Sequence, residues 1–276
     1  MGQIRFGYFL TPAAAEAGTL LRTARTLDRL GFDLVGIQDH PYQRRFLDSW
    51  TLLTAVAVST QHLTVFPDVA CLPLRPPAVL AKSAASLDVL TGGRVEMGVG
   101  AGGFWDAIAA FGGPRRAAGE AVRALAEAIE VMRLMWSAER SVRFDGEFYS
   151  LGGVHPGPRP AHPIGIWLGA YKPRMLWLIG EHADGWVPSL GFAGPEGLAE
   201  ATATLDAAAE KAGRDPASIR RVLNVGADVP VDELPDLLIR IATELRFDSF
   251  VFDGPADEAA LTHLAREVFP RVRNAV

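Results

Sequence analysis

Short, nearly continuous runs of hydrophobic residues alternate along this chain with longer segments in which hydrophobic residues recur every three or four positions. The short runs predict strands buried on both faces, and the longer segments predict amphipathic helices. The predicted strands cover residues 4–10, 32–38, 63–70, 94–103, 164–168, 185–188, 219–227 and 249–252. The predicted helices cover residues 16–30, 48–59, 76–90, 114–136, 173–182, 195–212, 234–245 and 258–268.

Eight strands, each followed by a helix, predict an α/β fold of the TIM (β/α)8 barrel type rather than an open doubly wound sheet. Residues 142–151 contain Asp145-Gly146, a hairpin turn signal, and four prolines follow between residues 156 and 163. These features predict an inserted hairpin and loop before strand five. With no linker or tandem repeat, residues 1–276 form a single predicted domain. An open sheet with a helical cap remains the alternative.

Composition narrows the class of protein further. Hydrophobic residues make up 49% of the 276 residues, which favours a large folded core over disorder. The net charge of -5 gives no electrostatic reason to expect a nucleic-acid or membrane partner. The single cysteine, Cys71, excludes an intramolecular disulfide and fits a reducing compartment. Neither a signal peptide nor a membrane-spanning run is recognisable, so a soluble cytoplasmic protein that acts on a small molecule is expected.

The strand ends hold the candidate chemistry, because TIM barrels place their active sites in the loops that follow the strands. His40, at the end of the second strand, is the best candidate for proton transfer, since histidine titrates near neutral pH. Asp39 or Asp68 is predicted to orient His40 or to raise its pKa. The competing interpretation is a histidine in a polar loop that caps the next helix.

A glycine-rich run, Gly98-Val-Gly-Ala-Gly-Gly103, fits the dinucleotide-binding pattern G-x-G-x-x-G. That interpretation is rejected because the run follows the fourth predicted strand, and no helix starts directly after it. An acidic residue is also missing from the end of a strand about 20 positions further on. The remaining interpretation is that bare backbone amides pack against a flat or phosphorylated ligand.

The segment Gly169-Ala-Tyr-Lys-Pro-Arg174 is a second candidate binding loop. Its strand ends in glycine, Pro173 opens a helix, and free amides at a helix N-terminus beside Lys172 and Arg174 suit a phosphate. An ordinary strand-to-helix connection is the alternative. No metal site is predicted, because none of the six histidines forms H-x-x-x-H or H-E-x-x-H. Cys71 is interpreted as a small buried residue, with a direct role left open.

Four segments resemble the bacterial luciferase-like flavin-dependent oxidoreductases, in the order in which that family has them. The longest runs from Leu72-Pro-Leu-Arg-Pro-Pro through Leu-Thr-Gly-Gly-Arg-Val-Glu-Met-Gly-Val-Gly-Ala-Gly. The other three are Gly36-Ile-Gln-Asp-His40, Ile166-Trp-Leu-Gly-Ala-Tyr and Glu181-His-Ala-Asp-Gly-Trp186. Together they extend over most of the chain.

This resemblance implies a barrel that binds the deazaflavin coenzyme F420 or FMN at the strand ends. It implies catalytic roles for His40 and Asp39 near the reactive ring, which favours F420 and hydride transfer to or from a small organic substrate. The alternative is an FMN-dependent monooxygenase, and a homodimer is expected from the family. The implied cofactor-binding residues are Asp68, Val69, Ala70, Gly100, Ala101, Gly102, Gly103, Gly169, Ala170, Tyr171, Lys172, Pro173 and Arg174. Around Asp68-Val69 many relatives bend the backbone, often with a non-proline cis peptide.

The sequence departs from the sugar-phosphate dehydrogenases that resemble this family at two positions. Gly103 stands where they carry glutamate, and Arg44 stands where they carry tryptophan, which puts that particular activity in doubt. A non-catalytic flavin-binding or cofactor-free barrel therefore remains a hypothesis. A lyase using Lys172 is disfavoured, because this lysine lies in a loop better suited to phosphate. Substrate choice is expected to depend on residues 41–46, 104–105 and 142–162.

Overall fold

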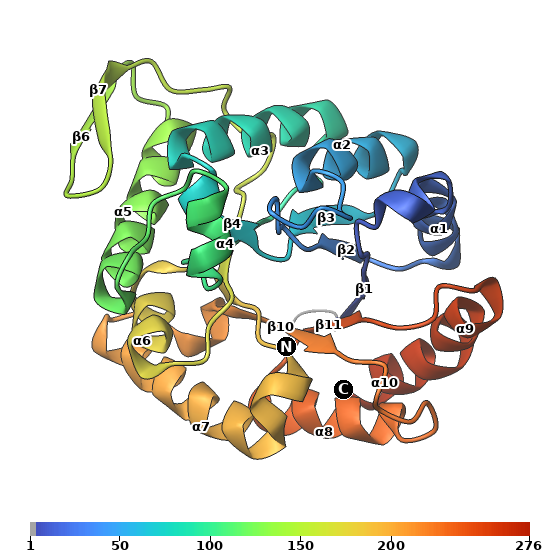
Figure 1. Cartoon of the computed structure of the whole chain (residues 1–276). Coiled ribbons are helices and arrows are strands. Elements are labelled where there is room, and N and C mark those ends of the chain that lie inside the picture. The colour runs from blue at the N-terminus through green and yellow to red at the C-terminus, as the bar shows by residue number, and fades with distance from the viewer. Residues whose placement is uncertain (1–3) are drawn as a thin grey trace.

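Nine short parallel strands form one sheet that curls into a barrel surrounded by helices (Figure 1). The computed structural model describes residues 4–276. The strands follow the order β3-β2-β1-β11-β10-β9-β8-β5-β4. Their bounds are β1 Arg5–Phe9, β2 Leu34–Ile37, β3 Thr64–Pro67, β4 Ala70–Cys71, β5 Met97–Gly100, β8 Ile166–Leu168, β9 Gly185–Trp186, β10 Arg220–Val225 and β11 Ser249–Phe252.

The two ends of this order, β3 and β4, are halves of one predicted strand, so the sheet closes on itself. A parallel bridge between Val65 and Val95 joins β3 to the residues before β5 and completes the ring. The predicted TIM barrel with eight strand positions is confirmed. What the hydrophobic pattern did not predict is the break between Pro67 and Ala70, where the Asp68–Val69 peptide bond is cis.

The helices lie outside the barrel, and all eight predicted helices are present, the sixth starting five residues earlier than predicted. Two further α-helices, Trp105–Ala110 and Phe269–Ala275, were not predicted, and the first begins two residues after Gly103, where no helix was expected. Their bounds are α1 Ala17–Leu30, α2 Ser49–Ser59, α3 Pro77–Thr91, α4 Trp105–Ala110, α5 Ala118–Trp136, α6 Pro173–His182, α7 Leu190–Lys211, α8 Leu234–Leu245, α9 Glu258–His263 and α10 Phe269–Ala275. Gly31 and Gly92 end α1 and α3 in the left-handed conformation that glycine adopts without strain. The last predicted helix, residues 258–268, consists of α9 and a π-helical turn at Leu264–Val268, and α10 continues the chain beyond its predicted end.

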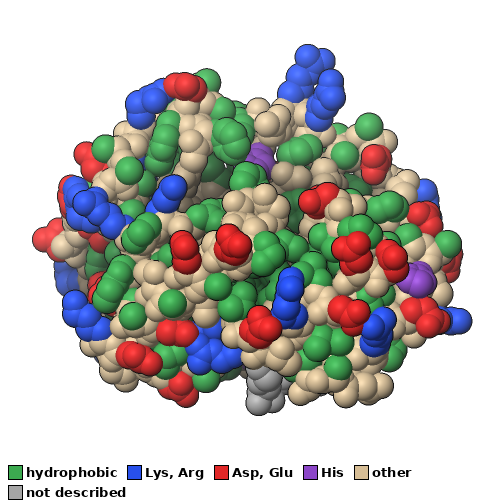
Figure 2. All heavy atoms as spheres, turned by 90° about the horizontal axis from the view of Figure 1, so that it is seen from below, with side chains coloured by type: hydrophobic (Ala, Val, Ile, Leu, Met, Phe, Trp, Pro, Cys, Tyr) green, Lys and Arg blue, Asp and Glu red, His purple; other side chains and the backbone are tan. Residues whose placement is uncertain are grey.

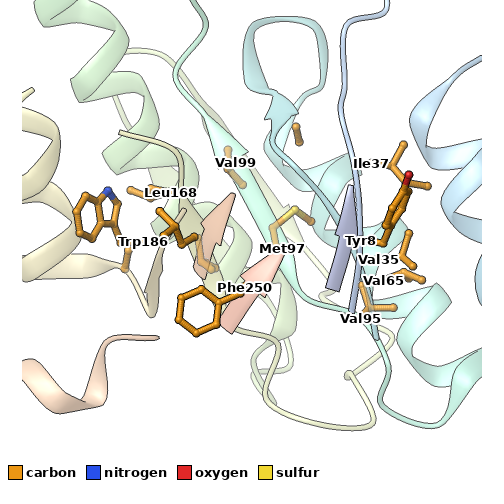
Figure 3. Close-up of a cluster of buried hydrophobic side chains, with 14 of the residues drawn as sticks. Tyr8, Val35, Ile37, Val65, Val95, Met97, Val99, Leu168, Trp186 and Phe250 are labelled. Atoms are coloured by element: carbon orange, nitrogen blue, oxygen red, sulfur yellow. The ribbon is translucent and has the colours of Figure 1, made fainter. Parts of the chain in front are cut away.

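Two apolar layers stabilise the barrel. Side chains on the outer faces of the strands pack beneath the helices, and ten of them are labelled in Figure 3, among them Val35, Met97 and Phe250. The barrel interior is filled by an inner layer, which consists of Leu34, Phe66, Trp167, Val187, Val222 and Val251. Because side chains alternate along a strand, the two layers come from alternate positions of the same strands.

The predicted insertion forms a separate two-stranded hairpin beside α5 (Figure 1). It consists of β6 Val142–Asp145 and β7 Ser150–Val154, so the second strand extends three residues beyond the predicted end. The Glu127 carboxylate of α5 accepts hydrogen bonds from the backbone amides of residues 147, 148 and 149 in the turn. This contact anchors the hairpin against the outer ring of helices. No helix within residues 4–276 is long and apolar enough to cross a bilayer.

Candidate active site

Directly above the inner layer, the strands present a second ring of side chains at their carboxyl ends. Two positions beyond Leu34, Phe66, Trp167, Val222 and Val251, each strand places the next residue that faces the barrel interior. We call this ring the floor layer, and it consists of Gly36, Asp68, Gly169, Asn224 and Asp253. In a TIM barrel, a ligand in the mouth contacts this level of the structure.

Val69 explains most of the glycines that line β5 and β8. A Cβ at Gly98 would overlap the carbonyl oxygen of Pro67, and one at Gly100 would lie 2.8 Å from Val69 Cγ2. Gly169 faces the same valine, with a Cβ distance of 3.3 Å. Glycine is required here because the chain between β3 and β4 bends into the barrel and needs the space. These glycines therefore accommodate protein, whereas a Cβ at Gly103 would meet nothing within 4 Å.

The Asp39 carboxylate is bound by Arg75 rather than by its sequence neighbour His40. Arg75 donates from Nε to Oδ2 at 2.6 Å and from Nη2 to Oδ1 at 2.7 Å, and the Ser49 hydroxyl donates to Oδ1 at 2.7 Å. The Cys71 amide donates to Oδ2 at 2.9 Å. Asp39 is 2% exposed, so this bidentate ion pair is largely shielded from water. The geometry gives Asp39 a positioning role behind the mouth.

His40 is half-buried and lies among aromatic side chains from two loops. Its Nδ1 is 2.7 Å from the Tyr42 hydroxyl, and the Phe104 ring meets the imidazole edge to face at 5.6 Å between centroids. Burial lowers the pKa of His40 from its usual value, and the nearby Asp39 charge opposes this shift only in part. Burial raises the pKa of Tyr42 to about 12, so its hydroxyl keeps its proton. His40 is therefore neutral at neutral pH, with Tyr42 as its partner.

Asp68 lies apart from His40 and is paired with an amide. Asn224 Nδ2, from β10, donates to Asp68 Oδ1 at 3.3 Å across the floor layer. Burial raises the pKa of Asp68 to about 7, and the hydrogen bond from Asn224 opposes that rise. The carboxyl group fits because Gly36 has no side chain: a Cβ there would lie 3.0 Å from Asp68 Oδ2.

The two predicted cofactor-binding segments lie side by side, because β5 and β8 pair in parallel. Residues 100–103 follow β5, and residues 169–174 lead from β8 into α6, whose first turn has no side-chain cap. Lys172 and Arg174 are exposed and have no acidic partner among residues 4–276. A Cβ at Gly119 would lie 3.7 Å from Arg174 Nη1, so this guanidinium reaches the start of α5. Free amides and two cations at neighbouring helix N-termini fit a phosphate group.

The remaining predicted residues line the same mouth. Ala70 and Ala170 are buried, and the Ala170 carbonyl accepts a hydrogen bond from Trp186 Nε1 at 2.9 Å. The Tyr171 hydroxyl accepts from the Ser189 amide at 2.8 Å. Burial and the Asp39 charge raise the pKa of the Cys71 thiol to about 11, so it stays protonated. Across the described part of the chain, no three His, Cys, Asp or Glu side chains gather closely enough to hold a metal ion.

Three residues of the site were missed at the sequence level, namely Arg75, Tyr42 and Asn224. Asn224 lies at the end of the seventh strand, so applying the strand-end rule to every strand would have found it. Tyr42 lies in the loop that was assigned only to substrate choice. Arg75 reaches Asp39 from 36 positions away, and no local pattern indicates that contact.

Comparison with known proteins identifies the family of this chain. The family model described as luciferase-like monooxygenase matches residues 4–233. The chain therefore belongs to the luciferase-like monooxygenase family of oxidoreductases, as the resemblance implied.

Several relatives with named activities are F420-dependent by name. An F420-dependent hydroxymycolic acid dehydrogenase of Mycobacterium tuberculosis is 31% identical over 258 residues, which cover 90% of this chain and 69% of that protein. An F420-dependent glucose-6-phosphate dehydrogenase of Intrasporangium calvum is 33% identical over 174 residues, or 59% of this chain. The chain spans only 51% of the length of that second relative.

Solved structures agree with the fold. An F420-dependent secondary alcohol dehydrogenase, in complex with an F420-acetone adduct, superposes with a TM-score of 0.84 at 19% identity, covering 98% of this chain and 99% of that one. The coenzyme F420-dependent tetrahydromethanopterin reductase of Methanopyrus kandleri gives a TM-score of 0.81 at 19% identity, covering 98% and 100%. At 19% identity, these structural similarities show a shared fold and nothing more specific.

Proposed function

We propose that this protein is an oxidoreductase that uses coenzyme F420 and transfers a hydride to or from a small organic substrate. The observation that carries the proposal is the 31% identity to an F420-dependent dehydrogenase over 90% of this chain. The residues at the mouth fit such a cofactor. A floor with two unpartnered polar atoms supports a flat ring, and the uncapped start of α6 with Lys172 and Arg174 supports its phosphate end.

In this proposal His40 handles the proton that accompanies the hydride. When the substrate is an alcohol, its C–H hydrogen would leave as a hydride, and F420 held by the floor layer and the start of α6 would supply the acceptor. His40 takes the hydroxyl proton on Nε2, while Nδ1–H donates to the Tyr42 oxygen. In the reverse direction, the His40 imidazolium gives its Nε2 proton to the developing alkoxide and returns to the neutral Nδ1–H form, which stays hydrogen-bonded to Tyr42. The lowered pKa of His40 keeps the imidazole neutral at neutral pH, as a general base must be before it accepts a proton.

Arg75 and Asp39 hold His40 in place from behind. Arg75 also donates to the Asp48 carboxylate at 2.6 Å, so one guanidinium fixes both ends of the loop from Asp39 to Asp48. We call Arg75, Asp39 and Asp48 the clamp, and it limits the movement of the segment that carries His40 and Tyr42. Asp39 therefore acts on the reaction through the position of His40, without touching the substrate.

The walls beside His40 favour a substrate with an apolar body. Phe104 is 64% exposed, packs against both His40 and Tyr42, and occupies the edge of the mouth where a substrate would lie. At the adjacent position, Gly103 leaves open space where an acidic side chain would otherwise stand. We infer that the substrate is an apolar secondary alcohol or the corresponding ketone rather than a sugar phosphate.

Fluorescence titration of the purified protein with F420 and with FMN tests the cofactor. Binding of F420 in preference to FMN is expected, and binding of neither would refute the proposal. Reduction of F420 is then followed with a series of secondary alcohols of increasing chain length, with glucose 6-phosphate as the comparison. Preference for FMN with oxygen consumption would indicate the monooxygenase instead, and binding without turnover would indicate a non-catalytic barrel.

We also propose that the protein forms a homodimer through the outer face of α3. Val79 and Leu90 lie three helical turns apart on this helix and are 60% and 74% exposed. Between them, Ser83 and Ser86 keep the stripe flat, which allows a second helix to approach closely. Light scattering of Val79→Asp/Leu90→Lys should give a monomer, whereas Val231→Lys, at another exposed valine, should match the wild type. A wild-type monomer would refute the proposal.

A further inference from the structure

Two buried polar atoms on the floor layer have no hydrogen-bond partner among residues 4–276. They are Oδ2 of Asp68 and Oδ1 of Asn224, and they belong to the same hydrogen-bonded pair. A buried polar atom without a partner is costly and uncommon in folded proteins. Asp68 Oδ2 lies against Gly36, where no side chain supplies a partner, and both residues belong to the floor layer directly beneath the mouth. A ligand seated on this layer is therefore the candidate partner for the two atoms.

The neighbours of Asp68 leave its carboxyl group without a compensating charge. Gly36 of β2 contributes no side chain, and Asn224 of β10 contributes a neutral amide. Beyond the end of the adjacent strand β2, Asp39 is neutralised by Arg75, and His40 is hydrogen-bonded to Tyr42.

Asp253, at the end of β11, is the remaining acidic group of the floor layer, and it is exposed at the rim. It does not contribute to the pKa of Asp68, which is governed by burial and by the Asn224 hydrogen bond. The carboxyl group of Asp68 therefore lies in an apolar setting, where its neutral form is favoured.

We propose that Asp68 binds the cofactor ring in its neutral carboxylic acid form, held in place by Asn224. The acid O–H of Oδ2 supplies a donor, and the Asn224 oxygen supplies an acceptor. Together they match a flat heterocycle with neighbouring carbonyl and N–H groups on one edge, as a deazaflavin or flavin has. The inference rests on the proposed function, because it concerns the cofactor of the same site. It adds a side-chain role for Asp68 to the backbone role that the family resemblance implied.

The protonation state of Asp68 makes ring binding depend on pH. The pKa of this carboxyl is about 7, so it is largely neutral in mildly acidic solution and ionises as the pH rises. The ionised form loses its donor and places a negative charge against a ligand carbonyl oxygen. If only the neutral form binds, the affinity falls up to about tenfold for each pH unit above the pKa.

The first test is fluorescence titration of F420 between about pH 5.5 and about pH 8.5, on either side of this pKa. The comparison is wild type against Asp68→Asn, which has the same shape and cannot ionise. We expect the wild-type Kd to weaken by about tenfold or more relative to the variant across this range. The exposed Glu210→Gln, in the last turn of α7, makes the same carboxyl-to-amide change; it is the matched control and should follow the wild type. Ionisation of the cofactor itself affects all three proteins equally and cancels in the comparison.

The second test needs no cofactor. Infrared difference spectra of the free protein should contain a protonated carboxyl band in mildly acidic solution that titrates near neutral pH and is missing in Asp68→Asn. In Asn224→Leu, the band should persist to higher pH, because the hydrogen bond that lowers the pKa is lost. This measurement also serves if the Asp68 variant proves too unstable for titration.

The outcomes separate this inference from the proposed function. If wild type binds neither F420 nor FMN, the proposed function fails, whatever the infrared result. If F420 binds with the same pH dependence in wild type and Asp68→Asn, the cofactor proposal stands and the role of Asp68 is refuted. Absence of the protonated carboxyl band in the wild type would also refute it.

Discussion

Asp39 and His40, which follow β2, point to opposite sides of the chain and have different partners. Consecutive side chains in extended backbone point to opposite faces, so Asp39 and His40 do not share an environment. Asp39 turns back to Arg75, while His40 faces Tyr42 and the mouth. A pairing of the two side chains, as the sequence predicted, would need a different backbone at this point. The hydrogen-bond partner of the His40 imidazole is therefore the Tyr42 phenol.

Replacing His40 should remove turnover while leaving the cofactor bound. For His40→Ala, we expect kcat to fall by about 10²- to 10⁴-fold, the usual contribution of a general base. The Kd for F420 should stay within about twofold, since the phosphate contacts and the floor are unchanged. Steady-state kinetics and fluorescence titration measure both, with the exposed His62→Ala as the control.

The wild-type rate should fall on the acid side only below about pH 6.5, because the pKa of His40 is lowered and its neutral form does the work. A fall in rate that begins above about pH 6.5, or full activity in His40→Ala, would contradict the role of His40 as the general base.

Arg75 should matter for stability more than any other charged residue near the mouth. Arg75→Met leaves the Asp39 carboxylate, 1% exposed, buried without its partner. Removing one member of a buried ion pair costs about 3–5 kcal/mol of unfolding free energy. Asp48→Asn removes the second, 45% exposed partner of Arg75 and should cost less than about 1 kcal/mol. Urea denaturation compares the two, and equal losses would show that the clamp does not depend on Asp39.

At the scale of elements, the broken strand β3–β4 dictates the composition of its neighbours. Gly98→Ala would place a methyl group on the Pro67 carbonyl oxygen, where a backbone atom cannot give way. We expect a loss of about 3 kcal/mol or more, or failure to fold.

Gly103→Ala lies in open space and should be neutral in stability. Thermal unfolding of the two variants distinguishes a glycine that makes room for protein from one that borders the mouth. If Gly98→Ala unfolds at the wild-type temperature, the close packing of residue 98 against the Pro67 carbonyl oxygen is contradicted.

The sequence predicted the alternation of strands and helices well, because apolar runs and glycine or proline boundaries are local signals. The turn at Asp145-Gly146 was found in the same way. The hydrophobic pattern ran through the break after Pro67, because Asp68 interrupts it for only one residue; the family resemblance alone pointed to a bend at Asp68-Val69. The partners of Asp39 and Asp68 come from 36 and 156 positions away, so only the closed barrel defines them.

At the scale of the whole molecule, stability and chemistry lie at opposite ends of the barrel. At the end away from the mouth, His162 Nδ1 contacts the buried Asp88 carboxylate at 2.8 Å, and Nε2 lies 3.9 Å from Glu96. Asp88 also accepts from the backbone amides of Ala161 and His162. This cluster ties the last turn of α3 to the loop before β8. On the face shown in Figure 2, acidic and basic side chains are interspersed.

The His162 cluster should make stability depend on pH. Glu96 and Asp88 raise the pKa of His162 above its usual value, while burial opposes them. A raised folded-state pKa stabilises the protein most below the unfolded-state pKa of about 6.5, and that contribution is lost as pH rises through the higher folded-state value. His162→Gln should therefore lose more stability at about pH 5.5 than at about pH 9. Chemical denaturation at the two pH values tests this, and an equal or reversed difference would contradict it.

Val69 and its glycine surroundings have an evolutionary consequence. The Val69 side chain occupies space that is free because the residues at 98, 100 and 169 are glycines. Gly98 and Gly100 cannot accept a side chain unless the bend moves, and a side chain at residue 169 would press on Val69 at 3.3 Å. In an alignment of relatives, we therefore expect these four columns to be invariant or to covary as a set. The open position at residue 103 is free of this constraint and should drift independently as relatives acquire different substrates.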